Sequence, residues 1–297
     1  MNRILIVGCG QVGQLLLKQR AHRARFRASA RRAESAAAAR ALGACPLPAD
    51  LDDRASLARL AGAADWVVHL APPPGAGPED MRTRRLIAAL AKGGSLPRRL
   101  VYVSTSGVYG DCGGERIDET RARAPETARA RRRVDAERAL RRFAAHCGVR
   151  LSILRVPGVY GPGRMPLERL AKGTPAVADA EDSYTNHIHI EDLAKAVWLA
   201  LYRARPGRVY HVVDDSEMKM GQYFDAVAAR AGLPRPPRIS RAEAQTRLSP
   251  ALLSFLNESR RLSNARLKRE LRVRLSYPRV ADGLAAWNLR RGETRLR

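Results

Sequence analysis

The beginning of the chain places a glycine-rich turn directly after a short apolar strand. The strand covers residues 3–7, and the turn reads Gly8-Cys9-Gly10-Gln11-Val12-Gly13. In such a G-x-G-x-x-G pattern the first glycine permits a tight turn, the second lets the backbone approach a pyrophosphate, and the third lets the next helix pack closely. N–H groups at the start of that helix bind the phosphates. The pattern therefore predicts a dinucleotide site; the alternative is a plain glycine turn.

Strand-like and helix-like segments then alternate along the first half of the chain. Segments that predict strands are residues 3–7, 25–29, 65–70, 99–104 and 149–154. Segments that predict helices are residues 12–20, 33–42, 56–60, 81–91 and 126–147. This alternation is typical of a parallel sheet with helices on both faces. With the glycine turn, it predicts an α/β fold with a Rossmann-type doubly wound parallel sheet.

The second half of the chain departs from this rhythm. Glycine and proline cluster in residues 157–166, which predicts a loop. Strands are expected at residues 187–190, 208–213 and 273–277, a helix at 192–202, and a linker or surface loop at 231–239. We therefore expect a Rossmann core of residues 1–155 with 191–213. A smaller substrate-binding lobe would comprise residues 156–190 and 214–297.

The end of the second predicted strand bears on the choice between NAD and NADP. An acidic residue there binds the ribose 2′-hydroxyl of NAD, whereas an arginine accommodates the 2′-phosphate of NADP. This segment carries Ser29, Arg31 and Arg32, and has no acidic residue before Glu34. Because guanidinium groups match phosphate geometry, these residues predict NADP, with NAD as a possible alternative. The two arginines are otherwise surface residues of an arginine-rich chain.

Several later motifs occur in the order and spacing of one known family. They are Ala49-Asp50-Leu51, His69-Leu70-Ala71, VSTSGVYG at 103–110, RVPGVYGPG at 155–163, HIHIED at 187–192 and YHVVDD at 210–215. On these residues the chain resembles the extended or atypical short-chain dehydrogenases/reductases, the NAD-dependent epimerase/dehydratase group. The resemblance implies that Asp50 and Leu51 contact the adenine and that Leu70 and Ala71 line the adenosine and ribose. It adds Pro72 and Pro157 to the cofactor contacts.

The resemblance also implies a catalytic Ser or Thr, a Tyr as general acid/base and a Lys four residues after that Tyr. It places Thr105 at the Ser/Thr position, Arg133 at the Lys position and Arg129 at the Tyr position. None of the six lysines follows a Tyr by four residues, so the Tyr–Lys pair is absent from the sequence. Arginine cannot donate a proton near neutral pH, because its pKa exceeds about 12. Arg133 is then expected to bind a ribose or a phosphate.

Two tyrosines are candidates to supply the missing phenol. Tyr109 ends the 103–110 motif near the expected nicotinamide position, and Tyr160 lies in the following turn over the same region. A phenol has a pKa near 10, and nearby arginine cations are expected to lower it. The alternative is that both tyrosines pack against the cofactor or the lobe.

Four residues are expected at the substrate. Ser106 lies beside Thr105, Tyr160 lies in the glycine-proline turn, and Arg260 and Asn264 precede a predicted C-terminal helix. The resemblance implies that the Asn264 segment lies over the substrate, and Arg260 suits an anionic ligand such as a nucleotide sugar. The alternative is a solvated helix start capped by Asn264.

The composition of the chain limits the classes of ligand and partner that we expect it to bind. The net charge is +25, but the arginines are spread along the whole chain, which favours an anionic small molecule over a specific nucleic-acid partner. The sequence has no run of 18 apolar residues and no Cys-x-x-Cys spacing among its four cysteines, so we expect no membrane span and no metal site. A cytoplasmic monomer or homodimer is expected.

These residues are compatible with two main functions. The first is an NADP-dependent oxidoreductase or epimerase/dehydratase-like enzyme that acts on a small polar or nucleotide-sugar substrate. The second is a non-catalytic NAD(P)-binding redox sensor or interaction protein, which the missing Tyr–Lys pair favours. A third and weaker hypothesis, a nucleic-acid-associated protein, rests on charge alone.

Overall fold

A computed structural model describes residues 2–92 and 94–287, and its centre is one parallel sheet of seven strands. The strand order is β12-β7-β5-β4-β1-β2-β3. The strands are β1 (Arg3–Val7), β2 (Arg25–Ala30), β3 (Cys45–Pro48), β4 (Trp66–His69), β5 (Arg99–Thr105), β7 (Arg150–Val156) and β12 (Arg208–His211). All six neighbouring pairs are parallel, which confirms the predicted Rossmann-type α/β fold. The order reverses between β1 and β4, where doubly wound sheets bind ligands at the carboxyl ends of their strands.

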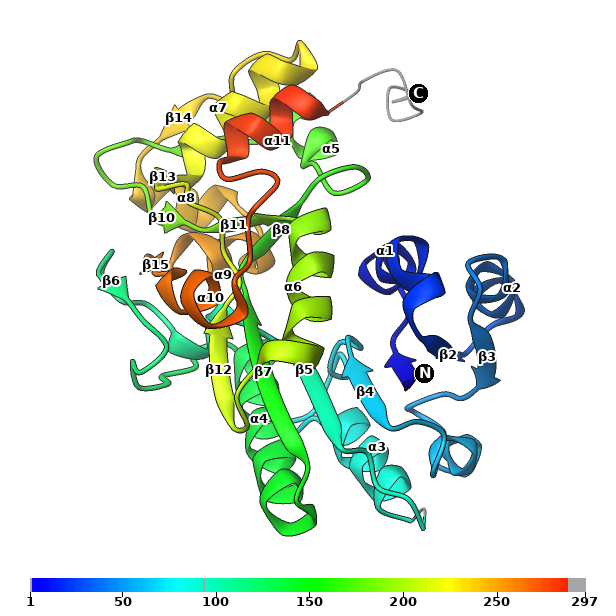
Figure 1. Cartoon of the computed structure of the whole chain (residues 1–297). Helices are drawn as coiled ribbons and strands as arrows, with labels where there is room; N and C mark the ends of the chain where they lie inside the picture. Colours follow the sequence, from blue (N-terminus) through cyan, green and yellow to red (C-terminus); the bar gives the residue numbers. More distant parts are fainter. Residues whose placement is uncertain (1, 93, 288–297) are drawn as a thin grey trace.

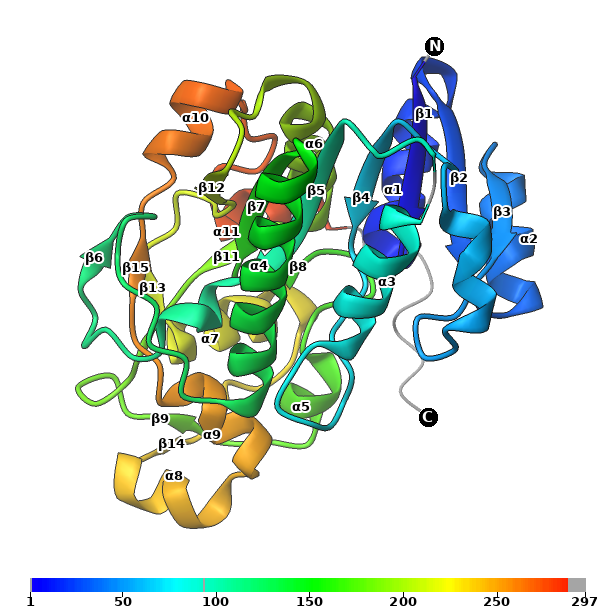
Figure 2. The ribbon, with the colours of Figure 1, turned by 90° about the horizontal axis from the view of Figure 1, so that it is seen from below.

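Helices cover both faces of this sheet (Figure 1). One layer holds α1 (Gln11–Arg20), α2 (Ala33–Ala41) and α6 (Ile190–Arg203). The other holds α3 (Met81–Ala91), α4 (Ala128–Cys147) and the short 3-10 helix η2 (Ala55–Leu60). Figure 2 shows α3 and α4 in front of the strands.

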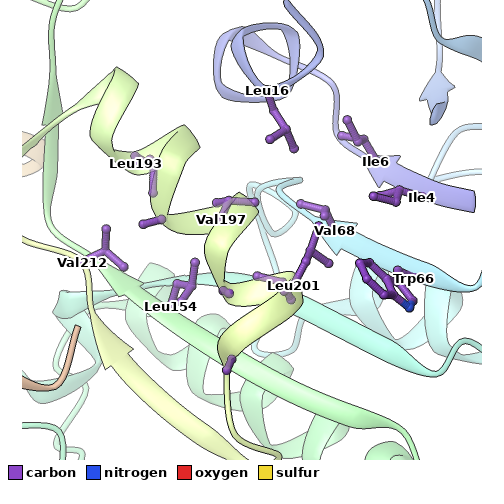
Figure 3. Packing of buried hydrophobic residues seen from close by; sticks show 14 of the residues in the cluster. Ile4, Ile6, Leu16, Trp66, Val68, Leu154, Leu193, Val197, Leu201 and Val212 are labelled. Atoms are coloured by element: carbon purple, nitrogen blue, oxygen red, sulfur yellow. The ribbon is translucent and has the colours of Figure 1, made fainter. Parts of the chain in front are cut away.

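Strand β1 shows how the sequence builds these two layers. Successive side chains of a strand point to opposite faces, so Ile4 and Ile6 join one buried cluster while Leu5 and Val7 join the other. In Figure 3, Leu16 of α1 lies near Ile6 and Val197 of α6 lies near Val68, while Leu193 of α6 lies on the side of Val212 and Leu154. All four β1 side chains from Ile4 to Val7 are fully buried, which fixes the turn that follows them.

Short elements form a second region beside the carboxyl ends of the strands. Its helices are α5 (Leu167–Ala171), α7 (Met220–Ala231), α8 (Arg241–Arg247), α9 (Pro250–Leu256) and α11 (Val280–Ala286). Its two-residue and three-residue strands are β6 (Arg116–Ile117), β8 (Gly158–Tyr160), β9 (Ala176–Val177), β10 (Tyr184–Thr185), β11 (His187–His189), β13 (Met218–Lys219), β14 (Arg238–Ile239) and β15 (Arg261–Leu262). They pair as β6–β15, β8–β11, β9–β14 and β10–β13. The remaining elements are α10 (Ala265–Leu271), η1 (Ala21–Arg23) and η3 (Ser106–Tyr109).

The predicted strand at 273–277 is wrong. Residues 272–279 form no strand, and the backbone there is bound by side chains of α6 instead. The Asp192 carboxylate accepts hydrogen bonds from the backbone N–H groups of Ser276 and Tyr277, at 2.8 and 2.9 Å. The apolar residues in this segment face the α6 layer without a partner strand. Two short strands, β8 and β14, lie inside segments predicted as loops.

The described residues contain no helix that is both long and apolar enough to span a membrane. All four cysteines are free thiols.

Candidate functional site

The glycine turn joins β1 to α1 at the carboxyl edge of the sheet. Gly8 has a φ of +85°, and a Cβ there would lie 2.5 Å from the backbone nitrogen of Ala71. A Cβ on Gly13 would lie 3.2 Å from Ile6 of the preceding strand. By contrast, a Cβ on Gly10 would meet no atom within 4 Å. Gly8 is therefore required by the fold itself, Gly13 is tightly packed against β1, and Gly10 borders open space.

The start of α1 offers free donors to that space. Gly10 is the N-cap residue, no side chain caps the helix, and its first turn carries no acidic residue. The N–H groups of a helix's first turn lack partners within the helix and carry partial positive charge. This arrangement suits a phosphate.

A cavity of about 470 Å³ opens at this turn. The structure brings eleven of the predicted cofactor residues to it: Gly8, Gly10, Gln11, Val12, Ser29, Arg31, Asp50, Leu51, Leu70, Ala71 and Pro72. Three others do not line it: Gly13 packs behind the turn, Arg32 is exposed at the start of α2, and Pro157 lines a second cavity. We refer to this first space as the glycine-loop cavity.

Ser29 and Arg31 have different positions at the end of β2. The Ser29 hydroxyl accepts a hydrogen bond from the Gly8 N–H at 3.1 Å, so Ser29 braces the turn. Arg31 is exposed at the rim and forms no ion pair within the described part of the chain. Its guanidinium is therefore available to an anion in the glycine-loop cavity.

Arg82 lines the same cavity and was not predicted. Its guanidinium binds the Asp52 carboxylate at 2.5 and 2.8 Å. Hydrogen bonds from Arg82 lower the pKa of Asp52, so the pair stays ionised near neutral pH. One arginine at the start of a helix gives no signal in a sequence this rich in arginine; only the fold shows that it faces the cavity.

A second cavity, of about 560 Å³, lies between the sheet and the short elements; we refer to it as the lobe cavity. Thr105, Ser106 and Arg260 line it, as does Arg164, which also lines the glycine-loop cavity. The two cavities therefore adjoin. Pro157, predicted at the cofactor, lies on this second cavity.

Glu258 is a further residue of the lobe cavity that sequence reasoning missed. A Cβ built on Gly107 would lie 3.6 Å from Glu258 Oε2 and 3.7 Å from Thr105 Oγ1, so both groups lie near Gly107. Arg260 Nη2 donates to Glu258 Oε2 at 2.6 Å. The backbone of this segment is held too, since the Ser259 carbonyl accepts from the N–H groups of Cys112 and Gly114. Glu258 is thus held at the part of the lobe cavity that Gly107 and Thr105 also line.

Two arginines occupy the helix face where the family resemblance places the Tyr–Lys pair. Arg129 lines the lobe cavity, with its guanidinium carbon 4.3 Å from the centre of the Phe255 ring. Arg133 lines neither cavity. Its Nη1 donates to the Tyr102 hydroxyl at 2.9 Å and to the Val103 carbonyl at 3.1 Å. Arg133 thus holds the carboxyl end of β5 in place without lining either cavity.

The structure argues against Tyr109 as the acid/base group. Tyr109 is 1% exposed, lines neither cavity, and contacts Arg155 and His211 through its hydroxyl. Burial outweighs the arginine and raises the pKa of Tyr109 to about 12, so the expected lowering is wrong. A short 3-10 helix turns this side chain into the core rather than toward the cavity.

Tyr160 and Asn264 also lie away from the lobe cavity. Tyr160 is fully buried against α11, where its hydroxyl donates to the Arg279 carbonyl at 3.3 Å, and burial raises its pKa. The Asn264 side-chain amide donates to the Val213 carbonyl at 3.0 Å and to Asp215 Oδ1 at 2.7 Å. The contacts of both residues are structural, because each holds a chain segment in place.

Comparisons with known proteins agree with this architecture. The family model described as "NAD dependent epimerase/dehydratase family" matches residues 4–213. Protein YeeZ of Escherichia coli strain K12 is 29% identical over 175 residues, which cover 58% of this chain and 61% of that protein. The chain thus matches less than two thirds of the length of these curated relatives.

Solved structures resemble the whole described fold. A functionally unknown conserved protein from Silicibacter pomeroyi has a TM-score of 0.78 at 30% identity, covering 96% of this chain and 98% of its own. UDP-glucose 4-epimerase from Thermus thermophilus, solved in complex with NAD, has a TM-score of 0.74 at 22% identity, covering 95% and 96%. UDP-glucose 4-epimerase from Thermotoga maritima, solved with UDP-glucose, has a TM-score of 0.76 at 18% identity, covering 95% and 96%. The last two likenesses concern the fold alone. Because the family model matches most of this chain, the chain belongs to the NAD-dependent epimerase/dehydratase family.

Proposed function

We propose that the chain binds NADP(H) in the glycine-loop cavity and is an oxidoreductase or epimerase/dehydratase-like enzyme. Its substrate, a small polar molecule or a nucleotide sugar, would bind in the lobe cavity. The observation that carries this proposal is that the two cavities adjoin at Arg164, with Thr105 on the second. Gly10, which leaves the start of α1 open, supports a bound pyrophosphate.

Arg31 supports NADP over NAD. It lies at the end of β2 on the glycine-loop cavity, where a 2′-phosphate is expected in this fold. The Thermus thermophilus relative was solved with NAD, so NAD is the alternative cofactor. Asp50 and Leu51 line the same cavity and would contact the adenine.

The nicotinamide ring, when bound, accepts or supplies a hydride. In our proposal Thr105 orients the reacting oxygen of the substrate, since a hydroxyl both donates and accepts hydrogen bonds. Glu258 accepts the proton in place of the missing phenol; it is a carboxylate on the lobe cavity, which Thr105 also lines. Arg133 is a positioning residue, because it holds Tyr102 and the Val103 carbonyl rather than facing a cavity.

A specific observation favours the second candidate, a non-catalytic NAD(P)-binding sensor. Arg129 and Arg133 lie on the α4 face where the family resemblance places the Tyr–Lys pair, and no lysine lines either cavity among the described residues. Such a protein would bind the cofactor without turnover.

We further propose a core of residues 1–155 with 191–213 and a lobe formed by the rest. A monomer or homodimer in the cytoplasm fits the four free thiols, since reducing compartments keep thiols free.

Calorimetric titration of the purified chain with NADPH and with NADH, at low and high salt, tests the proposal. Tighter binding of NADPH is expected, followed by turnover in a screen of sugar nucleotides and small hydroxy compounds. Binding without turnover of any compound would favour the sensor. If neither cofactor binds, the proposal fails.

A further inference from the structure

Five strands of the central sheet begin with an arginine. They are β1 with Arg3, β2 with Arg25, β5 with Arg99, β7 with Arg150 and β12 with Arg208. Because the strands of this sheet are parallel, their first residues lie at one edge, at the opposite end of the strands from the glycine turn. In the strand order from β12 to β2 only β4 lacks such a residue, so the five arginines form a row about 24 Å long at a strand spacing of about 4.8 Å. We refer to this end of the sheet as the arginine edge.

The segments that lead into these strands add further positive charge. Residues 20–25, 61–66, 92–99, 147–150 and 203–208 contain a single carboxylate, Asp65, and six more basic residues: Arg20, Arg23, Lys92, Arg98, Arg203 and Arg205. Asp65 is bound to Arg3 at 2.9 Å, and Arg208 is bound to Glu270 of α10 at 2.7 Å. The fold thus gathers at one edge arginines that are scattered in the sequence, with few carboxylates to balance them.

Some arginines at this edge stabilise the fold itself. Arg99 Nη1 donates to the Leu201 carbonyl at 2.7 Å, and Arg203 Nη1 donates to the Leu271 carbonyl at 2.9 Å, so both place positive charge at the carboxyl end of a helix. Four others form no side-chain hydrogen bond and no ion pair within residues 2–92 and 94–287, and all four are exposed: Arg25, Arg98, Arg150 and Arg205. These four cations are therefore available to a ligand from solution.

The cations of the arginine edge lie close enough to repel one another. Arg3 is in register with Arg25 on the neighbouring strand, and Arg99 is in register with Arg150. Like charges directly opposite each other in a sheet are destabilising. Burial, and after it the charges of Arg150 and Arg98, lower the pKa of Arg99. A polyanion that lies along the edge would relieve this repulsion.

An exposed aromatic ring lies at the same edge. Tyr202, near the end of α6, is 40% exposed, and its ring packs edge-to-face on Trp66, the first residue of β4, with 4.8 Å between the ring centres. The Tyr202 carbonyl accepts from Arg99 Nη1 at 3.2 Å, so Tyr202 adjoins the row. Proteins that bind single-stranded nucleic acids combine cations along the backbone with aromatic rings on which bases stack. The edge offers both.

We propose that the arginine edge binds a single-stranded nucleic acid, with its phosphates held by Arg25, Arg98, Arg150 and Arg205 and a base stacked on Tyr202. Guanidinium groups form paired hydrogen bonds with phosphate oxygens. Contacts with phosphates carry no sequence information, so binding without sequence preference is expected. The edge lies at the opposite end of the sheet from the two cavities, so this inference goes beyond the proposed function and does not depend on it.

A membrane surface matches this edge less well. Protein segments that lie on membranes bury an apolar face among the lipids as well as placing cations at the headgroups. Among the described residues, Leu96 is the large aliphatic side chain that is exposed near the edge, at 36%. Anionic vesicles are therefore the competing partner in the test.

The test measures, by fluorescence anisotropy at several salt concentrations, the binding of a labelled oligouridylate of about twelve nucleotides, within the site sizes known for single strands. The protein is saturated with NADP⁺, so that the glycine-loop cavity does not compete for the probe. The edge variant is Arg98→Gln/Arg150→Gln. The matched control is Arg235→Gln/Arg247→Gln, which removes the same charge from exposed positions among the short elements at the other end of the sheet. Thermal unfolding and NADPH titration check each variant, and Arg25→Gln takes the place of the edge variant if that protein unfolds.

We expect the edge variant to bind oligouridylate at least about tenfold more weakly. The slope of log affinity against log salt should fall by about 1.4, since each phosphate contact contributes about 0.7 for a single strand. The control variant should change the affinity by less than about twofold. Tyr202→Leu should weaken binding of oligouridylate by about fivefold or more and leave binding of heparin, a polyanion without bases, unchanged. Comparison with an oligothymidylate of equal length identifies RNA or DNA by the tighter binding.

The inference is overturned if oligouridylate and oligothymidylate do not bind, or if the edge and control variants weaken binding equally, because net charge alone would then explain it. Binding to phosphatidylserine vesicles without binding to either oligonucleotide would assign the edge to a lipid surface instead. Unchanged oligonucleotide affinity in Tyr202→Leu would exclude base stacking and with it the assignment to a single strand. Normal NADPH binding in the same samples would leave the proposed function intact in each case.

Discussion

The Tyr109 hydroxyl lies 2.7 Å from Arg155 Nη1 and 2.5 Å from His211 Nε2 in the protein core. Burial lowers the pKa of His211 to about 3, so this imidazole is neutral. Its Nδ1 lies 3.2 Å from the Ser263 carbonyl, which can only accept, so Nδ1 carries the proton. Nε2 then accepts from Tyr109, whose oxygen accepts in turn from Arg155. Arg155 also forms a buried ion pair with Glu137 at 2.7 Å, so Tyr109 is one part of a polar network that joins β7, β12 and α4.

We therefore predict that Tyr109→Phe destabilises the protein and leaves cofactor binding unchanged. Loss of the hydroxyl leaves a buried arginine donor and a buried histidine acceptor unpaired, at a cost of about 1–3 kcal/mol. Urea unfolding measures this cost, and NADPH titration measures the binding. Tyr202→Phe is the control, because Tyr202 is 40% exposed and water can replace its hydroxyl. If Tyr109→Phe has normal stability but binds NADPH more weakly, Tyr109 takes part in the cofactor site and the prediction is wrong.

The sequence predicts the glycine turn and six of the seven strands of the sheet, because these are local patterns; β3, whose four residues include two prolines, shows no such pattern and was not predicted. The apolar run of β1, the glycine spacing and the start of α1 are continuous in the chain, and their geometry follows from neighbouring residues. Glu258 and Arg164 could not be found in this way. They come from segments far from Thr105 in sequence and reach its neighbourhood only through tertiary folding.

Tyr109 illustrates a second limit of sequence reasoning. Its motif fixes where the residue lies along the chain but not which way its side chain points. The 3-10 helix that turns it inward depends on partners from β7 and β12, which are distant in sequence. The strand expected at 273–277 failed for a related reason, since side chains of α6 satisfy its backbone and no strand lies beside it within the described residues.

The glycine turn gives a prediction that separates folding from cofactor binding. Gly8→Ala is expected to prevent stable folding, because Gly8 has a φ of +85° and its Cβ would lie 2.5 Å from Ala71. Gly10→Ala is expected to fold, with a loss of about 1 kcal/mol or less, because its Cβ has free space. That Cβ would nevertheless occupy the space proposed for the pyrophosphate, so NADPH affinity should fall at least about tenfold. Circular dichroism and NADPH titration measure the two effects, and unchanged affinity in Gly10→Ala would contradict the proposed cofactor position.

Two adjacent arginines test the choice of cofactor. Arg31→Ala should weaken NADPH binding by about tenfold or more, because a charge-assisted hydrogen bond to phosphate contributes about 1.5–3 kcal/mol. NADH binding should change by less than about twofold, since NADH lacks the 2′-phosphate. Arg32→Ala removes the same charge but lies off the glycine-loop cavity, so it should affect neither cofactor. Equal weakening of NADPH and NADH by Arg31→Ala would rule out a role specific to the 2′-phosphate.

The buried carboxyl group of Asp214 leads to a prediction of how the stability of the protein depends on pH. It is 3% exposed, and its Oδ2 has no hydrogen-bond partner within the described residues. Burial, with the nearby Asp215 and Asp192 carboxylates, raises the pKa of Asp214 to about 7. In the unfolded chain an Asp ionises near pH 4. Between about pH 4 and pH 7 the folded protein therefore holds a proton that the unfolded chain has lost, so this group's contribution to stability falls as pH rises through that window.

Asp214→Asn removes this ionisation and should stabilise the protein at pH 8 relative to pH 5 by about 3 kcal/mol, because about two pH units separate pH 5 from the raised pKa and each contributes about 1.4 kcal/mol. Asp215→Asn is a control at the neighbouring position, and its effect on stability should have the opposite sign. Burial raises the pKa of Asp215, but hydrogen bonds from Lys268 and Asn264 outweigh burial and lower it, so its carboxylate stabilises the fold above about pH 4. Urea unfolding of both variants at pH 5 and pH 8 measures the difference. Equal gains in Asp214→Asn at the two pH values would mean that Asp214 ionises normally in the folded protein, and that its buried oxygen is satisfied by water.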